Sequence, residues 1–236
     1  MTNLRLISWN IHGGRGVSGR RNLDATCQQI HLFNPHIVCL QEVHRHLPWG
    51  AWQNQPAKVA RYLGMNSWYM GCLQFAGLGE GILVASSLTC NSITKLVLPS
   101  VGEPRGLLTV QLRLDNTLNL TVLCTHWGLA PTERLAQSDV VCRKINATTG
   151  PTVLCGDLNE RYDLAPVANI SRTTRLTDAF HDRAKPTFPA DKPSQRIDYC
   201  FTSPDIAVRS TRLLGSDVES DHLALAIDLD IGEAMS

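Results

Sequence analysis

The sequence has no long apolar run, and nothing in its 236 residues approaches the roughly 20 that a membrane-spanning helix needs. Its first residues also lack the apolar segment and small-residue cleavage site of a secretory signal, so we expect a cytoplasmic protein. Net charge is almost absent, because 22 Lys and Arg against 21 Asp and Glu give +1. The overall charge therefore does not call for a polyanionic partner such as duplex nucleic acid.

Repeats, low-complexity tracts and interdomain linkers are missing as well. A chain of this length can bury the core of one large α/β domain or of two small ones. Since nothing divides the sequence, we expect a single domain over residues 1–236. The apolar content of 43% and the charged content of 18% are ordinary for a globular protein.

The eight cysteines include no CxxC pair, which disfavours a thiolate zinc site or a thioredoxin-type redox motif. Four of them lie within apolar, strand-like runs, where a free cysteine behaves as a small hydrophobic residue: Cys39, Cys124, Cys155 and Cys200. We interpret the cysteines as reduced thiols in the core.

Short apolar runs typical of strands alternate with helical spacings along the chain. About ten strands are expected, within residues 4–11, 37–40, 67–71, 82–85, 93–98, 107–114, 118–125, 153–155, 197–202, 208–214 and 223–229. A helix begins after the capping residue Asn22, and two more cover residues 56–63 and 131–147. Residues 160–193 are irregular, with room for a short helix. This alternation predicts a layered α/β arrangement.

Six short polar motifs stand at the ends of these apolar runs, in the order SWNIHG, LQEV, THWG, GDLN, RIDYCF and ESDH. Attack of water on a phosphate ester needs a divalent cation, a general base, donors for the phosphoryl oxygens and help for the leaving oxygen. Magnesium prefers oxygen ligands. The motifs place such groups where they can converge on one sheet edge: Asn10, Glu42, His126, Asp157, Asn159, Asp221 and His222.

Together these motifs resemble those of the endonuclease/exonuclease/phosphatase superfamily. That superfamily includes abasic-site endonucleases, pancreatic-type DNases, neutral sphingomyelinases and inositol polyphosphate 5-phosphatases. The resemblance runs from SWNIHG to ESDHLAL and so covers essentially the whole chain. It implies a four-layered α/β sandwich of the DNase I-like kind, in which two mixed β-sheets pack face to face with helices outside. It also implies dependence on Mg²⁺ or Mn²⁺.

The resemblance implies a role for each motif residue. Glu42 resembles the principal metal-ligating carboxylate, with Asn10 beside it, and Asp221 would touch the metal directly or through water. Asp157 resembles the aspartate that orients or deprotonates the attacking water, or that protonates the leaving oxygen. Asn159 resembles the amide that positions this water and contacts phosphate.

The histidines and one arginine complete the implied site. His222 is expected to bind a phosphoryl oxygen, and Asp198 to hydrogen-bond its ring and favour the imidazolium form. His126 resembles a second phosphate-contacting or acid histidine. Arg105 falls where part of the family places an arginine facing the substrate, but a solvated turn explains it equally well.

Other polar residues receive no firm role. We assign no catalytic function to Glu80, because GEGILVAS matches the corresponding family segment loosely. His44 and His46 have no third ligand nearby and are interpreted as ordinary loop residues. The three arginines of the loop Gly13–Arg21 either flank the substrate phosphate or are simply solvated, and both interpretations stay open.

The sequence therefore predicts a metal-dependent hydrolase of phosphate esters. We favour a phosphodiesterase acting on a small or lipid-borne phosphodiester by in-line attack of activated water. The alternatives are a nuclease, including one that cleaves abasic DNA, a phosphatase, or a catalytically inactive binding scaffold. The expected partner is the phosphoester substrate alone, with the protein a monomer.

Overall fold

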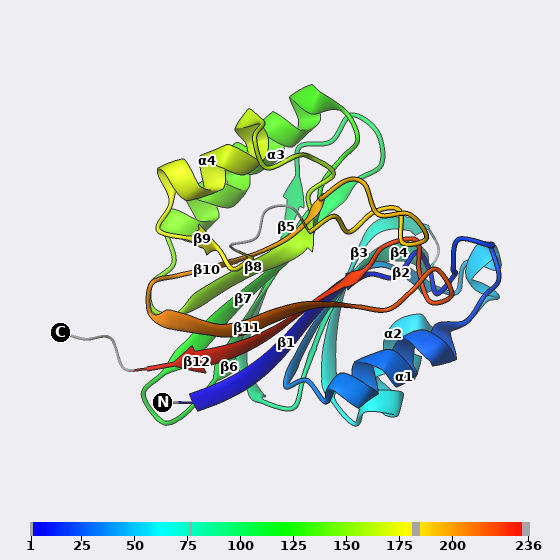
Figure 1. Cartoon of the computed structure of the whole chain (residues 1–236), viewed down its shortest axis with the longest axis horizontal. Coiled ribbons are helices and arrows are strands. Elements are labelled where there is room, and N and C mark those ends of the chain that lie inside the picture. The colour runs from blue at the N-terminus through cyan, green and yellow to red at the C-terminus, as the bar shows by residue number, and fades with distance from the viewer. Residues whose placement is uncertain (1, 76, 181–184, 233–236) are drawn as a thin grey trace.

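The computed structural model describes residues 2–75, 77–180 and 185–232. In this part of the chain, two mixed sheets of six strands each pack face to face, and helices cover their outer faces (Figure 1). The predicted four-layered α/β sandwich is confirmed. Periodicity alone did not predict two sheets; that expectation came from the resemblance.

The first sheet has the order β11-β12-β1-β2-β4-β3. Its strands are β1 (Thr2–Asn10), β2 (Ile37–Arg45), β3 (Asn66–Phe75), β4 (Leu78–Ser86), β11 (Ile206–Leu214) and β12 (Ala224–Ile231). Only β1 and β2 are parallel among these described strands. Because they are parallel neighbours, their polar carboxyl-terminal residues lie at the same edge of the sheet.

The second sheet has the order β5-β6-β7-β8-β10-β9. Its strands are β5 (Thr89–Leu98), β6 (Arg105–Arg113), β7 (Asn119–His126), β8 (Thr152–Asp157), β9 (Thr177–Asp178) and β10 (Asp198–Thr202). Here β7 and β8 are parallel, with His126 paired to Asp157, and β10 runs antiparallel to β8 with Asp198 opposite Asp157. Three predicted site residues therefore stand side by side on neighbouring strands.

Each pair of helices covers one sheet (Figure 1). Helices α1 (Leu23–Phe33) and α2 (Gln55–Leu63) pack on the first sheet, and α3 (Pro131–Asn146) and α4 (Ala165–Thr173) pack on the second. Asn22 caps α1 by accepting a hydrogen bond from the backbone N–H of Ala25, as the sequence predicted. Within the described residues, no helix combines the length and apolar character needed to cross a membrane.

The inner faces of the sheets form the main core. Alternation along β1 sends Leu4 and Leu6 into this inter-sheet core and Ile7 and Trp9 toward the helices, so both faces of the strand are buried. The four cysteines expected in apolar strands are fully buried in the inter-sheet core: Cys39, Cys124, Cys155 and Cys200. All eight cysteines, each within the described residues, are free thiols.

Several elements differ from the sequence expectation. The described residues form twelve strands rather than about ten, and most extend beyond their apolar runs. The irregular segment contains α4 and the two-residue strand β9. Strand β2 does not end at Leu40 but continues to Arg45, with a register shift between Leu40 and Val43. Glu42 therefore lies inside a bulged strand, not just beyond its end.

Candidate functional site

Asp157, the last residue of β8, lies at the centre of the polar groups that join the two sheets. Asn10, the last residue of β1, donates from Nδ2 to Oδ2 of Asp157 and to Oε1 of Glu42, each at 2.9 Å. The backbone N–H of Asn159 donates to the other Asp157 oxygen, Oδ1, at 2.9 Å. One buried amide thus holds two carboxylates from different sheets in fixed positions.

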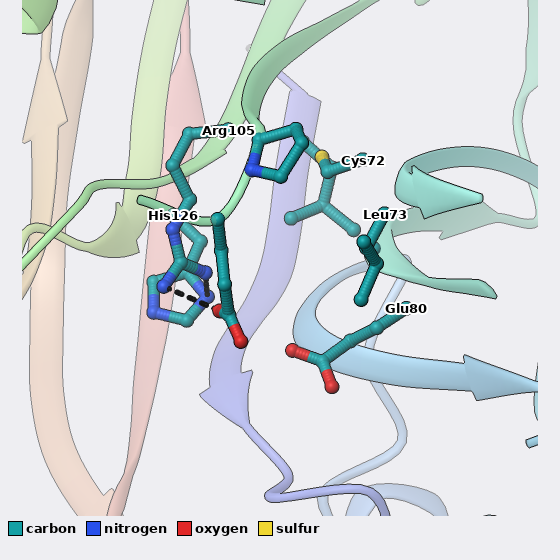
Figure 2. A pocket seen from close by; sticks show the side chains of 9 residues that line it. Cys72, Leu73, Glu80, Arg105 and His126 are labelled. Carbon is teal, nitrogen blue, oxygen red and sulfur yellow. Dashed lines mark hydrogen bonds and ion pairs between the residues drawn. The ribbon is translucent and has the colours of Figure 1, made fainter. Parts of the chain in front are cut away.

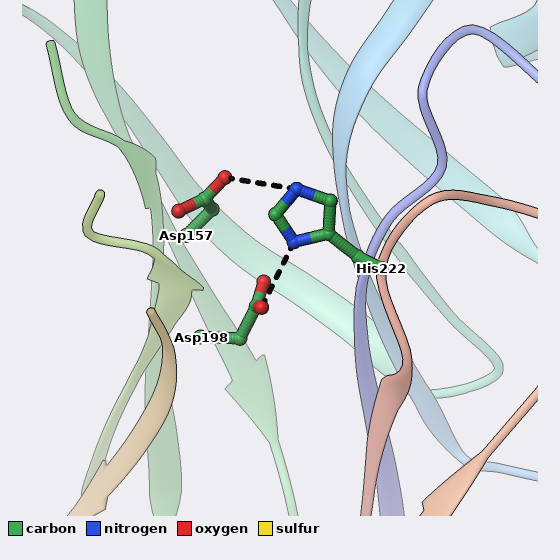
Figure 3. A group of neighbouring side chains, drawn as sticks. All are labelled: Asp157, Asp198 and His222. Atoms are coloured by element: carbon green, nitrogen blue, oxygen red, sulfur yellow. Dashed lines mark hydrogen bonds and ion pairs between the residues drawn. The ribbon is translucent and has the colours of Figure 1, made fainter. Parts of the chain in front are cut away.

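His222 and Asp198 form a buried pair beside Asp157 (Figure 3). Nδ1 of His222 donates to Oδ2 of Asp198 at 2.9 Å, while Nε2 lies 3.7 Å from Oδ2 of Asp157. Burial alone would lower the pKa of His222, but the charges of Asp198 and Asp157 raise it to about 10. With this raised pKa the ring is an imidazolium at neutral pH.

Burial also raises the pKa of Asp157, to about 6, against the opposing charge of His222. With a pKa near neutral pH, the carboxyl of Asp157 can both accept and release a proton. Its Oδ2 is the shared focus of the site, because the Nε2 atoms of both His126 and His222 lie 3.6 and 3.7 Å away. Those gaps exceed a direct hydrogen bond.

His126, the last residue of β7, points toward Arg105 at the start of β6 (Figure 2). Nη1 of Arg105 donates to Nδ1 of His126 at 3.0 Å, and Nη2 pairs with Oε2 of Glu103 at 3.0 Å. Burial, together with the charges of Arg105 and His222, lowers the pKa of His126 well below its usual value. The ring is neutral.

The arginine also fixes the tautomer of His126. Because a guanidinium can only donate, Nδ1 of the neutral ring must accept, and the single ring proton sits on Nε2. That proton faces Oδ2 of Asp157. Nδ2 of Asn159 lies 3.1 Å from the same Nε2 and donates to the carbonyl of Trp127 at 2.9 Å. Because an amide nitrogen also only donates, its contact with Nε2–H is not a hydrogen bond, and the charged guanidinium at Nδ1 decides the tautomer.

Glu42 stands at the bulge of β2 with a positive φ of 53°, a backbone conformation that L residues seldom adopt. Burial and the charges of Glu80 and Asp157 raise the pKa of its carboxyl above the usual range. Nearby, Oε2 of Glu80 accepts from Nε2 of the buried His44 at 3.0 Å. Acidic groups therefore gather around Glu42 in excess of the basic groups that could neutralise them.

This donor set fits a hard divalent cation. Nδ2 of Asn10 donates to Oε1 of Glu42 at 2.9 Å, whereas Oδ1 of Asn10, its one atom able to bind a metal ion, accepts from the backbone N–H of His12 at 3.1 Å. Asp221 lines the same cleft as Glu42, with Oδ2 3.4 Å from Nδ1 of His12. Carboxylate and amide oxygens are the ligands that Mg²⁺ prefers, and a cation would relieve the raised pKa of Glu42. Glu42, Asn10 and Asp221 are the residues that would hold it.

A second grouping with metal-ligand types is Asp157, Asp198 and His222, whose ligand atoms lie within 4.8 Å of one another. Its hydrogen bonding does not suit a metal ion. The Nδ1–H of His222 is already donated to Asp198, and the raised pKa keeps a proton on Nε2 as well. A protonated ring nitrogen has no lone pair to offer a metal ion.

A family model described as Endonuclease/Exonuclease/phosphatase family matches residues 7–222 of this sequence. The chain belongs to this family. A search of curated proteins found no match.

Solved structures of the endonuclease/exonuclease/phosphatase family share the fold. A protein from Beutenbergia cavernae is 25% identical, with a TM-score of 0.83 over 99% of this chain and 73% of that one. A mannosyl-6-phosphatase from Bacteroides thetaiotaomicron is 17% identical, with a TM-score of 0.80 over 97% and 100% of the two chains. The catalytic domain of human Nocturnin with bound sulfate is 19% identical, with a TM-score of 0.77 over 98% and 94%. The latter two show the fold alone.

The family motifs meet in one cleft of about 470 Å³. Seven residues predicted for the site line it: Glu42, Arg105, His126, Asp157, Asn159, Asp221 and His222. The other two stand behind this lining, where Asn10 binds Glu42 and Asp157, and Asp198 binds His222. The structure thus brings all nine together, and Arg105 is buried against His126 instead of solvated in a turn.

Sequence reasoning gave no site role to other residues that line the cleft, among them His12, His44, Trp49, Glu80 and Phe188. His12 could have been found, because it belongs to SWNIHG and lies two residues after Asn10. Glu80 and His44 could not, since their meeting requires the bulge in β2 and the pairing of His44 with Glu80 across β2 and β4. Of the three loop arginines, only Arg15 lines the cleft.

Proposed function

We propose that this protein is a Mg²⁺- or Mn²⁺-dependent phosphodiesterase that hydrolyses a small or lipid-borne phosphodiester by in-line attack of activated water. The observation that carries the proposal is the convergence of both imidazole Nε2 atoms on Oδ2 of Asp157. Each gap is longer than a direct hydrogen bond, so neither Nε2–H is committed to Asp157, and both can donate to an oxygen of water or phosphate placed beside the three groups. Family membership supports phosphoester hydrolysis as the reaction class.

In the proposed reaction, Asp157 takes a proton from the attacking water, which Asn159 helps to position. His222, held as an imidazolium by Asp198, donates from Nε2 to a phosphoryl oxygen and stabilises the charge that develops there. His126 donates a hydrogen bond from its neutral Nε2–H to the phosphate and keeps the proton. As the oxygen of water bonds to phosphorus, the bond from phosphorus to the leaving oxygen breaks, and the leaving group takes a proton from solvent. A divalent cation held by Glu42, Asn10 and Asp221 would neutralise phosphoryl charge when bound.

Arg105 acts through His126 in this scheme. Its Nη1 and Nη2 are engaged by His126 and Glu103, which favours a positioning role over direct contact with the phosphate. It fixes the tautomer that presents Nε2–H to the substrate. The cytoplasmic location, the monomeric state and the single-domain organisation stay predictions from the sequence.

A metal-depletion experiment tests the proposal. Protein stripped with EDTA should not hydrolyse bis(p-nitrophenyl) phosphate, and Mg²⁺ or Mn²⁺ should restore the activity. Glu42→Gln should lower kcat/KM by at least about 100-fold, because it removes one negative ligand of the cation. Asp230→Asn, which removes a carboxylate paired with Arg209 outside the cleft lining, is the matched control and should leave the rate unchanged.

The same assay separates the alternatives. p-Nitrophenyl phosphate as substrate reports a phosphatase, and single-stranded or abasic DNA reports a nuclease. Undiminished hydrolysis in EDTA-treated protein would contradict the metal assignment. Failure to cleave any of these esters in the presence of metal would favour the inactive scaffold.

A further inference from the structure

Exposed apolar side chains border the mouth of the cleft on both sides. Trp49 and Trp52 follow β2 and are 45% and 62% exposed, whereas Val101 and Leu129 belong to loops of the second sheet and are 85% and 72% exposed. Trp49 and Leu129 also line the cleft itself. Single exposed apolar side chains are common on protein surfaces, but those that border a binding site are placed to meet a partner that carries the ligand. We call these four residues the apolar rim.

The topology places the rim at one end of the molecule. Trp49 and Leu129 follow the carboxyl-terminal ends of β2 and β7, whose site residues meet around Asp157. Val101 joins Leu129 through Glu133, which accepts from the backbone N–H of Val101 at 2.8 Å and packs directly against Gly128. The rim therefore has an indole side and an aliphatic side, with the cleft between them.

The indole side is held in a defined shape. Arg21 donates to the carbonyls of Trp49 and Pro48 at 3.1 and 3.4 Å, and the backbone N–H of Trp52 donates to the carbonyl of Leu47 at 2.9 Å. Ala51 and Trp52 both have positive φ angles, 55° and 58°. Such conformations are costly for L residues and are retained at functional segments. These bonds fix the backbone of the segment that carries both indoles, and the ring of Trp49 also makes an edge contact with His44, with centroids 6.5 Å apart.

Positive charge lies next to the indoles. The loop from Gly13 to Arg21 contains three arginines and no acidic residue. Arg15 faces the cleft, Arg20 is exposed, and Arg21 fastens this loop to Trp49. This part of the rim therefore combines indole rings with guanidinium groups, a combination that suits the headgroup level of an anionic membrane.

We propose that the apolar rim and the Gly13–Arg21 loop dock on an anionic lipid surface, so that the cleft opens onto lipid headgroups. The inference rests on the proposed function and narrows its substrate to a phosphodiester presented by that surface. Indoles favour the membrane interface because one end of the ring is apolar and the other donates a hydrogen bond. Aliphatic Val101 and Leu129 gain from entering the same apolar layer.

Single-stranded nucleic acid fits this surface less well. Its bases stack on aromatic rings, yet the second side of the rim offers only aliphatic side chains. A polyanion also needs a basic groove that follows its backbone, whereas the arginines beside the indoles belong to one loop and Arg105 in the cleft is paired with Glu103.

Vesicle co-sedimentation tests the inference. The full chain should sediment with vesicles of phosphatidylcholine and phosphatidylserine, and less with phosphatidylcholine alone. In the double variant Trp52→Ala with Val101→Ala, both changed side chains lie outside the cleft lining. Its partition onto vesicles should weaken at least about tenfold, because two apolar side chains that enter the lipid layer are lost. Its hydrolysis of the soluble diester bis(p-nitrophenyl) phosphate should stay unchanged.

The matched control removes exposed apolar groups elsewhere. Leu32 is 69% exposed in the last turn of α1, and Ile93 is 43% exposed in the middle of β5, opposite Val110. Leu32→Ala with Ile93→Ala should sediment like the wild-type chain. Equal loss of sedimentation in both double variants would overturn the inference, since vesicle binding would then not depend on the apolar rim.

Two further outcomes separate this inference from the proposed function. Hydrolysis of the soluble diester without sedimentation on either vesicle overturns the docking inference and leaves the phosphodiesterase assignment intact. Binding of a single-stranded oligonucleotide that is lost in the Trp52 and Val101 variant, without vesicle binding, assigns the rim to nucleic acid. Sedimentation without hydrolysis of any ester contradicts the proposed function alone.

Discussion

Asp157 and His222 have different roles in the proposed acid–base chemistry because their surroundings raise the pKa of Asp157 to about 6 and that of His222 to about 10. Each group holds its proton more tightly than in water: burial has this effect on Asp157, and two neighbouring carboxylates have it on His222. His126 shows the reverse, since burial and the charge of Arg105 leave it neutral. Two histidines facing one carboxylate oxygen thus carry different charges, and the difference comes from an acidic partner in one case and a basic partner in the other.

Asp198→Asn tests this division through the pH dependence of the rate. His222 has a raised pKa of about 10, so its imidazolium is present below that pH and is lost as pH rises through it. Removing the charge of Asp198 lets burial lower the pKa, and the alkaline limb of the kcat/KM profile should move to lower pH. We also expect kcat at neutral pH to fall by at least about 100-fold.

Asp205→Asn provides the comparison. Asp205 pairs with Arg175 at 2.9 Å, a similar contact between an aspartate and a cationic side chain that lies outside the cleft lining. Its loss should leave both limbs of the profile in place. An alkaline limb that stays put in Asp198→Asn would refute the assigned role of Asp198.

At the residue scale, the sequence placed eight of the nine proposed site residues because each belongs to a short motif near the end of an apolar run, whereas Arg105 came from the resemblance. Their roles stay proposals. The sequence could not show which way the side chains of β2 point. The positive φ of Glu42 and the register shift between Leu40 and Val43 bring Glu42 to Asn10. The same irregularity brings His44 to Glu80. Two-residue periodicity describes a regular strand and is silent about a bulge within one.

Among the elements, the pairing of β7 with β8 carries a strict steric requirement. Gly156 lies opposite Thr125 in this parallel pair, one residue before Asp157. A Cβ atom at Gly156 would stand 2.0 Å from the carbonyl oxygen of Thr125, which is a backbone atom and cannot swing away. The strand that presents Asp157 therefore needs glycine for close approach.

Gly156→Ala should lower the free energy of unfolding by about 3 kcal/mol, at the upper end of typical overpacking costs, because β7 and β8 must move apart. The midpoint of urea unfolding measures the loss. Gly102→Ala is the control, since nothing lies within 4 Å of its added Cβ. Identical midpoints for the two variants would contradict the steric argument.

Most elements were predictable in kind but not in extent. Buried strands with continuous apolar runs, such as β8, were recognised, whereas β3 and β5 extend through polar residues that only pairing to a neighbour makes regular. The sequence allows but does not place helix α4, because its nine residues have only a short apolar stripe within an irregular segment. The two-residue strand β9 depends on pairing with β10 and has no local signal.

The two-sheet arrangement belongs to the scale of the whole molecule. Apolar alternation shows that a strand has a buried face, but it does not show whether a second sheet or a helix covers that face. The resemblance carried over by motif order predicted the sandwich, and the shared inter-sheet core confirms it. The cleft follows from the same packing, because Asn10 of the first sheet and Asp157 of the second meet only when the sheets lie face to face.

Salt dependence tests the proposed substrate class for the whole molecule. The net charge is only +1, and the one dense basic run, Gly13–Arg21, sends only Arg15 into the cleft lining. Binding to intact duplex DNA should therefore be weak, with a log–log salt slope that corresponds to fewer than about five neutralised phosphates. Arg15→Gln should reduce that slope by about one. kcat/KM for single-stranded or abasic DNA, compared with a lipid-borne diester at low and physiological salt, completes the measurement. A large preference for DNA together with a steep slope would instead assign this chain to the nucleases of its family.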